Sequence, residues 1–255
     1  MKLTDTHCHL YLDEFKNDID EVIRRAEEAG VTKFYLPAID SKEMEKLLWL
    51  EKSFPGKCFA MTGLHPCSVK EGYKAELELV SGLLSHRKFA AIGEIGLDLY
   101  WDKTFIKEQY DAFRVQAIWA LQYELPVVIH TRNAMQETID LIKEFVPRGI
   151  RGIFHCFSGN YENALEIINA GFYIGIGGVI TYKNSGLAEV VARIGLEHIV
   201  LETDAPFLAP VPFRSKRNES SNLKYIVEKL AEVKQVSADE VAAITTANAE
   251  KIFRL

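Results

Sequence analysis

Eight short apolar runs alternate with helical patterns along this chain of 255 residues. Runs of this length, rich in β-branched residues, are typical of buried parallel strands. They span Leu3–Thr6, Lys33–Ala38, Cys58–Gly63, Ala90–Ile95, Pro126–Ile129, Gly152–Phe154, Phe172–Ile176 and Ile199–Glu202. Eight strand–helix units predict an α/β fold, a TIM-type (β/α)8 barrel that forms a single domain over residues 1–255. A doubly wound open sheet is the alternative, because periodicity cannot show closure.

The helical patterns have recognisable ends. Apolar residues recur at helix spacing in residues 18–29, and Gly30 follows as a helix stop. Residues 161–170 end at Gly171 in the same way. Ser237 followed three residues later by Glu240 is a capping-box pattern, which predicts that the last helix begins there.

Composition narrows the class of protein. No segment approaches the roughly 20 apolar residues that span a bilayer, so we expect no membrane contact. Charged and polar residues at the start argue against an export signal, and four cysteines without a CxxC pair suit a reducing compartment, so we expect a cytoplasmic protein. A net charge of −6 argues against a broad nucleic-acid-binding face but allows a small site for one strand end. The sequence contains no heptad pattern that would indicate an obligate protein partner.

Five of the seven histidines follow predicted strands. They are His7, His9, His65, His130 and His155. In a parallel barrel the residues after each strand gather at one rim, where catalytic groups lie. Two acids, Glu94 and Asp204, come from strands four and eight at the same rim.

Convergence of these groups predicts a metal site. His7 and His9 lie two positions apart, so both imidazoles point to one side and Cys8 points away. Taken singly, His130 fits a satisfied buried histidine better than a ligand, and Glu94 fits a helix-capping or salt-bridging carboxylate as well as a ligand. Together the polar groups would be buried without partners unless a metal bound them. The predicted ligands are His7, His9, Glu94, His130, His155 and Asp204.

The number of ligands indicates two ions. One structural zinc needs four ligands, and six fit two divalent ions, which could be zinc, manganese or magnesium. Asp5 shares strand parity with the first histidines, so it either orients one of them or forms a buried ion pair. Glu202 shares parity with Asp204 and is expected deeper in the barrel.

Several motifs resemble those of the TatD family of metal-dependent deoxyribonucleases, within the amidohydrolase superfamily. They are "DTHCHL", "TGLHPC", "AIGEIGLD", "VVIHTR", "FHCFSG", "LETDAPFLAP", "RSKRNE" and "TTANAEKIF". They extend from the first residues to the last. The chain departs from the family pattern at Cys67, Leu99, Ser215 and Ser220–Ser221, and none of these positions is a predicted ligand.

The resemblance implies a TIM-type barrel and hydrolysis of DNA phosphodiesters. It implies that one metal is bound by His7, His9 and Asp204, that a second is bound by His130 and His155, and that Glu94 bridges both. It places His65 at the mouth of the active site. A carbamylated lysine bridges the metals elsewhere in the superfamily, and Glu94 in that place favours the TatD branch.

These features predict a 3′-to-5′ exonuclease acting on single-stranded DNA ends through a water activated by two metals. Asp204 is the expected proton acceptor, and Glu94 and His65 complete the catalytic set. The substrate is expected to contact His65, Arg214, Arg217 and Asn218, although residues 214–218 could equally be a solvated loop. Tyr100, Trp101 and Phe207 lie near the rim, where aromatic rings can stack bases.

Two other functions remain open. An amidohydrolase acting on a small amide, lactone or ester would use the same dinuclear site, because fold and metals do not fix the substrate. A metal-stabilised barrel without catalytic activity would instead have a closed site with no position left for water.

Overall fold

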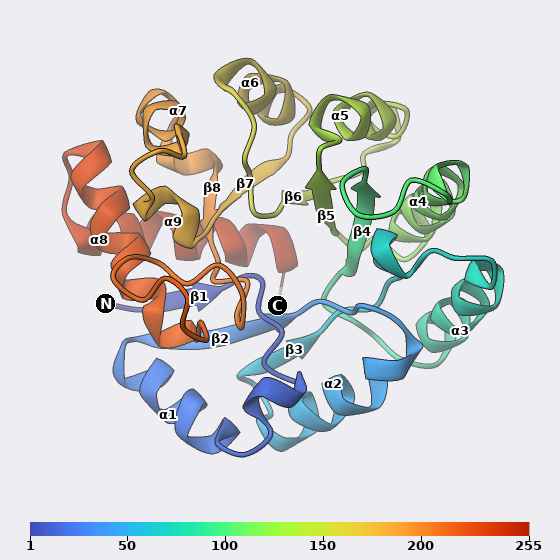
Figure 1. The fold of residues 1–255 in the computed structure, drawn as a ribbon, viewed down its shortest axis with the longest axis horizontal. Coiled ribbons are helices and arrows are strands. Elements are labelled where there is room, and N and C mark those ends of the chain that lie inside the picture. Colours follow the sequence, from blue (N-terminus) through green and yellow to red (C-terminus); the bar gives the residue numbers. More distant parts are fainter. Residues whose placement is uncertain (255) are drawn as a thin grey trace.

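A computed structural model describes residues 1–254 and shows a ring of parallel strands surrounded by helices (Figure 1). The strands are β1 (Leu3–Asp5), β2 (Val31–Leu36), β3 (Cys58–Ala60), β4 (Ile92–Asp98), β5 (Val127–Arg132), β6 (Gly152–Phe154), β7 (Tyr173–Ile176) and β8 (Ile199–Leu201). The α-helices are α1 (Ile19–Glu28), α2 (Ser41–Ser53), α3 (Tyr73–His86), α4 (Ile106–Gln122), α5 (Met135–Lys143), α6 (Tyr161–Asn169), α7 (Leu187–Arg193), α8 (Leu223–Lys234) and α9 (Ala238–Phe253). Within residues 1–254, no helix combines the length and the apolarity needed to cross a membrane.

Hydrogen bonds close the strands into a barrel. Strands β1 to β3 pair in chain order, as do β4 to β8. The two groups meet where Thr62 pairs with Ile92, and there the Ala90 amide donates to the Ala60 carbonyl at 2.8 Å. At the other seam the Thr6 amide donates to the Leu201 carbonyl at 3.0 Å. The predicted barrel is confirmed, and the open-sheet alternative is wrong.

Strands β4 and β5 extend further than the sequence predicts. The predicted runs stop at Ile95 and Ile129, whereas the strands continue to Asp98 and Arg132. Gly96 lies opposite His130, and a Cβ atom at Gly96 would lie only 1.9 Å from the His130 carbonyl oxygen. The missing side chain lets the two backbones stay close over this stretch. His130 therefore lies within β5 rather than after it, and Glu94, which the predicted run already included, lies well before the end of β4.

The predicted helix ends agree with the structure. Gly30 and Gly171 follow α1 and α6 with φ values of 92° and 83°, the left-handed conformation that glycine adopts readily. The Ser237 side chain accepts a hydrogen bond from the Glu240 amide at 3.1 Å and caps α9.

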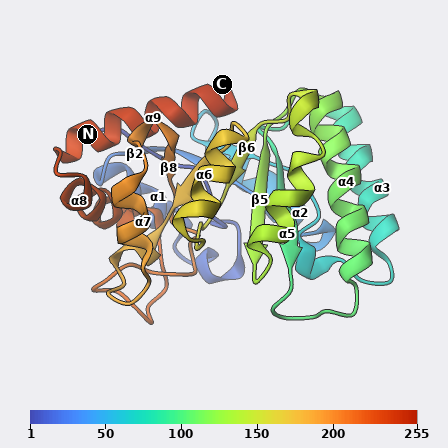
Figure 2. The ribbon, with the colours of Figure 1, turned by 90° about the horizontal axis from the view of Figure 1, so that it is seen from above.

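The last helix plugs one end of the barrel. Val128 and Ile153 share strand parity with His130 and His155, and they pack in one buried cluster with residues of α9. Within it, the Phe253 ring stacks on Tyr35 with centroids 3.7 Å apart. Figure 2 shows α9 lying across this end of the molecule. The opposite end, where the strands point, holds the polar residues described next.

Candidate metal centre

The predicted histidines and acids form a buried cluster at the C-terminal ends of the strands. His7, His9, Glu94 and His155 are each at most 4% exposed. The Nε2 atoms of His7 and His9 lie 3.2 Å apart, and the His7 ring stacks on that of His155 with centroids 3.8 Å apart. The expected pairing of the first two imidazoles is confirmed, and Cys8 turns away to contact the Tyr35 carbonyl.

The carboxylate of Glu94 divides this cluster into two groups. Its Oε2 atom lies 3.2 Å from His7 Nε2 and 3.6 Å from His9 Nε2. Its Oε1 atom lies 2.7 Å from both His130 Nδ1 and His155 Nε2. Burial raises the pKa of Glu94, but the charges of the surrounding histidines outweigh burial and hold this pKa well below its usual value. The glutamate is therefore an ionised group shared by two sets of imidazoles.

A bulge between β4 and β5 aims Glu94 into the cluster. Ile92 pairs with Val127 and Ile95 pairs with Ile129, so two residues of β4 face one residue of β5. Bulges of this kind turn a side chain away from the regular alternation and are frequent beside active sites.

Asp204 joins the first of the two groups from the loop after β8. Its amide donates to the His7 carbonyl at 2.9 Å, and its Oδ1 atom lies 3.5 Å from His7 Nε2 and 3.6 Å from His9 Nε2. Burial raises the pKa of this carboxyl. The hydrogen bond to His9 and the charges of His7 and His155 outweigh burial and lower the pKa.

Neighbouring groups fix which nitrogen of two histidines faces the cluster. The Tyr11 hydroxyl donates to the Pro37 carbonyl at 2.7 Å, so at 2.8 Å it accepts from His9 Nδ1 and leaves His9 Nε2 with a lone pair. His130 Nε2 lies 3.1 Å from Asp98 Oδ2, a bond that leaves His130 Nδ1 directed at Glu94. Carboxylate and hydroxyl partners of this kind orient metal-binding histidines.

His65 is held as a hydrogen-bond donor. Its Nδ1 accepts from the Cys67 amide at 3.0 Å, so the neutral ring carries its proton on Nε2, 3.4 Å from Glu94 Oε1. Geometrically His65 also groups with Glu94 and His130 as a possible ligand set. The occupied Nδ1 favours a donor role at the mouth of the site over metal ligation.

The residues fit divalent metal ions. His7 Nε2 lies 3.2 Å from both His9 Nε2 and Glu94 Oε2 and 3.5 Å from Asp204 Oδ1, and His9 Nε2 lies 3.6 Å from the same two oxygens. Nδ1 atoms of two buried histidines, His7 and His155, have no hydrogen-bond partner among the described residues. Imidazole and carboxylate donors suit zinc or manganese.

Two residues that contact the cluster, Asp98 and Tyr11, were not predicted from the sequence. Asp98 accepts from His130 through Oδ2, and its Oδ1 accepts from the amides of Tyr100 at 2.9 Å and Trp101 at 3.1 Å. Its position four residues after Glu94, on the same face of β4, could have indicated it had the strand been extended. Tyr11 lies two residues after His9, and this spacing could likewise have indicated that it contacts the cluster.

Asp5 contacts its predicted partner only through the backbone, since its Oδ1 atom accepts from the His7 amide at 3.4 Å. Its carboxylate is fully buried and accepts from the Ser220 hydroxyl at 2.6 Å and from the Thr203 hydroxyl and amide at 2.6 and 3.0 Å. It accepts from no ring nitrogen and no cation among the described residues. Burial raises its pKa to about 7 against these hydrogen bonds. Asp5 therefore ties β1 to the loop after β8.

Glu202 lies below the cluster, at the depth that its parity predicts. Its Oε1 atom is 3.6 Å from His155 Nδ1 and accepts from the Cys156 amide. It is fully buried, and its Oε2 atom has no hydrogen-bond partner among the described residues.

The predicted substrate loop is largely engaged within the fold. Arg217 forms two hydrogen bonds of 2.7 Å to the Asp18 carboxylate. Asn218 is buried, and its amide donates to two backbone carbonyls at 2.7 and 2.8 Å. Arg214 is exposed and stacks on Tyr182, with 4.3 Å between its guanidinium carbon and the ring centroid. Only Arg214 of these three thus has a guanidinium or amide available in this conformation.

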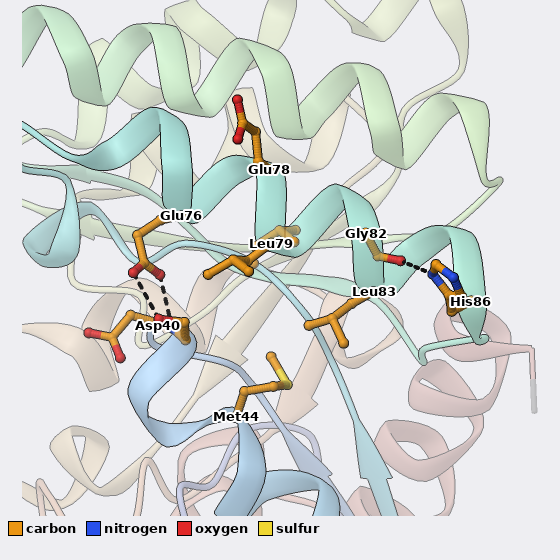
Figure 3. Close-up of a pocket in the computed structure, with 11 residues that line it drawn as sticks. Asp40, Met44, Glu76, Glu78, Leu79, Gly82, Leu83 and His86 are labelled. Carbon is orange, nitrogen blue, oxygen red and sulfur yellow. Dashed lines mark hydrogen bonds between the residues drawn. The ribbon is translucent and has the colours of Figure 1, made fainter.

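A separate hollow of about 420 Å³ lies between α2 and α3 (Figure 3). Its lining is mostly apolar and includes Met44, Leu79 and Leu83. The Glu76 carboxylate at its edge accepts from the Ser41 amide and hydroxyl. None of the predicted ligands lines this hollow. The groups suited to metal-dependent chemistry therefore lie in the metal cluster and not in this hollow.

Comparisons with known proteins agree with this geometry. Residues 4–254 match the family described as "TatD related DNase". The chain is 37% identical to YabD of Bacillus subtilis, named an uncharacterized metal-dependent hydrolase, over 99% of both chains. It is 33% identical to the "3'-5' ssDNA/RNA exonuclease TatD" of Erwinia tasmaniensis, over 98% of this chain and 99% of that protein. The crystal structure of YjjV, a TatD homologue from Escherichia coli, superposes with a TM-score of 0.93 at 31% identity, over 99% of this chain and 98% of that one.

Proposed function

The chain belongs to the TatD related DNase family of metal-dependent hydrolases, and we propose that it removes nucleotides from the 3′ ends of single-stranded DNA with two divalent ions. The alternative of a barrel without catalytic activity is wrong, because the family and its named relatives are hydrolases.

The position of Glu94 carries the two-metal proposal. One of its oxygens faces His7 and His9, and the other faces His130 and His155. A carboxylate that offers one oxygen to each of two imidazole sets is suited to bridge two ions. Asp204 completes the first set, so the proposed ligands are the six residues predicted from the sequence.

The chain's own groups then have defined tasks. Bound ions supply positive charge, which acidifies water and stabilises negative charge on phosphate oxygens. Asp204 is an ionised carboxylate next to His7 and His9, and from that position it would accept the proton of the attacking water. His65 presents an N–H at the mouth, where it donates to a phosphate oxygen. Glu94 holds the two sets at a fixed separation.

The choice of substrate rests on a relative and on charge. The Erwinia tasmaniensis relative is named for exonuclease action on single-stranded DNA and RNA. A net charge of −6 suits a local site for one strand end better than a surface that covers a duplex.

A metal-resolved nuclease assay tests the proposal. The stripped protein is given magnesium, manganese or zinc together with end-labelled single-stranded DNA, beside the variants Glu94→Gln and His130→Ala. His198→Ala is the matched control, because His198 is 38% exposed and lies outside the cluster. We expect stepwise release of nucleotides from the 3′ end with metal, loss of this activity in the two site variants and full activity in the control.

The outcome separates the two remaining functions. Intact DNA in the presence of every metal, with two ions bound, contradicts the nuclease proposal and directs the search to small amides, lactones and esters. Release of nucleotides from the 5′ end contradicts the proposed polarity alone.

A further inference from the structure

An exposed arginine lies against two exposed aromatic rings beside the metal cluster. The guanidinium carbon of Arg132 is 4.3 Å from the centroid of the Tyr100 ring and 5.0 Å from that of Trp101. The two rings meet edge to face, with centroids 4.8 Å apart. Tyr100 is 50% exposed and Trp101 is 67% exposed, although both are large and apolar. We call these three residues the aromatic–arginine cluster.

The aromatic–arginine cluster is attached directly to the proposed metal ligands. Arg132 ends β5 two residues after His130, so its side chain leaves the strand on the same side. The Asp98 carboxylate holds His130 with one oxygen and the amides of Tyr100 and Trp101 with the other. The Asp98 carboxylate therefore links His130 to the backbone of Tyr100 and Trp101, and this link fixes how far the two rings lie from the metal cluster.

The charge of Arg132 is available to a ligand. Among the described residues, its side chain forms no ion pair and no hydrogen bond, whereas Arg217 is committed to Asp18. Because Arg132 ends β5 and lies against Tyr100 and Trp101, which follow β4, its guanidinium lies on the β4–β5 side of the barrel mouth.

We propose that the aromatic–arginine cluster binds the nucleotide next to the scissile bond, with Trp101 stacking on its base and Arg132 binding its phosphate. This inference rests on the proposed nuclease function and replaces Arg217 and Asn218 as the main substrate contacts.

Single-stranded nucleic acid is the occupant that matches this chemistry. Sequence-independent binding of single strands combines aromatic rings that stack on bases with cations that bind the backbone. A planar guanidinium can lie flat on a ring and still offer its N–H edge to phosphate oxygens. A small neutral ester or lactone would use neither the exposed ring face of Trp101 nor the unpaired charge of Arg132.

Two substrates test the inference. One is a single-stranded oligonucleotide, and the other is bis(p-nitrophenyl) phosphate, a diester with no neighbouring nucleotide. We expect Trp101→Ala to raise KM for the oligonucleotide roughly 5- to 150-fold more than KM for the small diester, the range typical of base stacking. Trp101→Phe should recover most of the loss. Arg132→Ala should lower the slope of log KM against log salt by about 0.7, the value for one phosphate contact on a single strand.

Trp49→Ala is the matched control, since Trp49 is 58% exposed on α2, outside the aromatic–arginine cluster. Its KM values for both substrates should equal those of the wild type. Binding is measured separately, by the rise in fluorescence anisotropy of a dye-labelled oligonucleotide added to metal-free protein. We expect binding by the wild type and a markedly higher Kd for Trp101→Ala.

The outcomes distinguish the inference from the function on which it rests. If the oligonucleotide is cleaved but Trp101→Ala and Arg132→Ala change both KM values equally or not at all, the inference is wrong and the nuclease function stands. Binding that depends on Trp101 without any cleavage supports the binding site and contradicts the nuclease function. A wild-type protein that neither binds nor cleaves the oligonucleotide contradicts both.

Discussion

Replacing Asp98 with asparagine should weaken metal binding without disturbing the fold. The asparagine Oδ1 atom can still accept from the amides of Tyr100 and Trp101, so the loop after β4 keeps its position. Its NH2 group would face His130 Nε2, which now donates to a carboxylate oxygen at 3.1 Å. His130 would have to turn Nε2 into an acceptor and move its proton to Nδ1, the nitrogen that faces Glu94 and is needed for the ion.

The expected loss follows from this change of tautomer. Removing a carboxylate that orients a metal-binding histidine costs about 10- to 100-fold in metal affinity, or about 1.4 to 2.8 kcal/mol. Only one of the two imidazole sets contains His130, so we expect the affinity for one ion to fall and the other to change little.

The dependence on pH provides a second signature. Burial lowers the pKa of His130, but its bonds to Asp98 and Glu94 outweigh burial and raise this pKa. In the wild type, protonation of His130 therefore competes with metal binding more strongly as the pH falls. Asp98→Asn removes part of that rise, so the loss of affinity should be largest at pH 8 and should shrink towards pH 6.

Competition titrations with a buffered chelator, using manganese or zinc at pH 8 and pH 6, measure both quantities. Asp102→Asn is the matched control, because Asp102 lies in the same loop but pairs with Lys70 at 2.6 Å, away from the histidines. Affinities of Asp98→Asn within threefold of the wild type at pH 8 would refute the proposed role of this carboxylate.

Three further predictions concern the metals and the barrel. Glu94→Gln should bind fewer than two ions per chain, measured by elemental analysis after gel filtration; two retained ions would contradict the bridging role. An ion present at about 100 times its Kd stabilises the folded protein by about 2.7 kcal/mol, so removing each such ion with a chelator should lower Tm by roughly 5 to 11 °C. An unchanged Tm in calorimetry would show that the cluster is not occupied. Phe253→Ala should lower the free energy of unfolding by about 3 to 5 kcal/mol in denaturant titrations, because it leaves a cavity where the Phe253 ring packs on Tyr35. A loss below about 1 kcal/mol, or one equal to that of Phe253→Leu, would contradict this packing.

The sequence predicts the order of the elements and the contents of the cluster well, and for a physical reason. Buried parallel strands need unbroken apolar runs, and the polar residues that follow them cannot be explained by packing. His7, His130 and His155 were found in this way, and the structure brings them together.

The sequence predicts local exceptions poorly. The true length of β4 depends on Gly96 approaching the neighbouring strand, and the direction of Glu94 depends on a bulge, and both are properties of a pair of strands. The role of Arg217 could not be read from a basic loop either. Its partner, Asp18, is distant in the chain and comes close only because the loop after β8 packs on the segment before α1.

The seam between β1 and β8 has a consequence for how the protein is made. Its hydrogen bond from Thr6 to Leu201 joins residues 195 positions apart, and the proposed ligands His7 and Asp204 lie on opposite sides of it. During synthesis on the ribosome, His7 and His9 are made early and Asp204 late. For most of that time the nascent chain therefore lacks the acid that completes their ligand set. Contacts so distant in sequence form late, and they slow folding. The ion of this first set should therefore be captured after the ring has closed, and its loss should first be seen as faster hydrogen exchange at this seam.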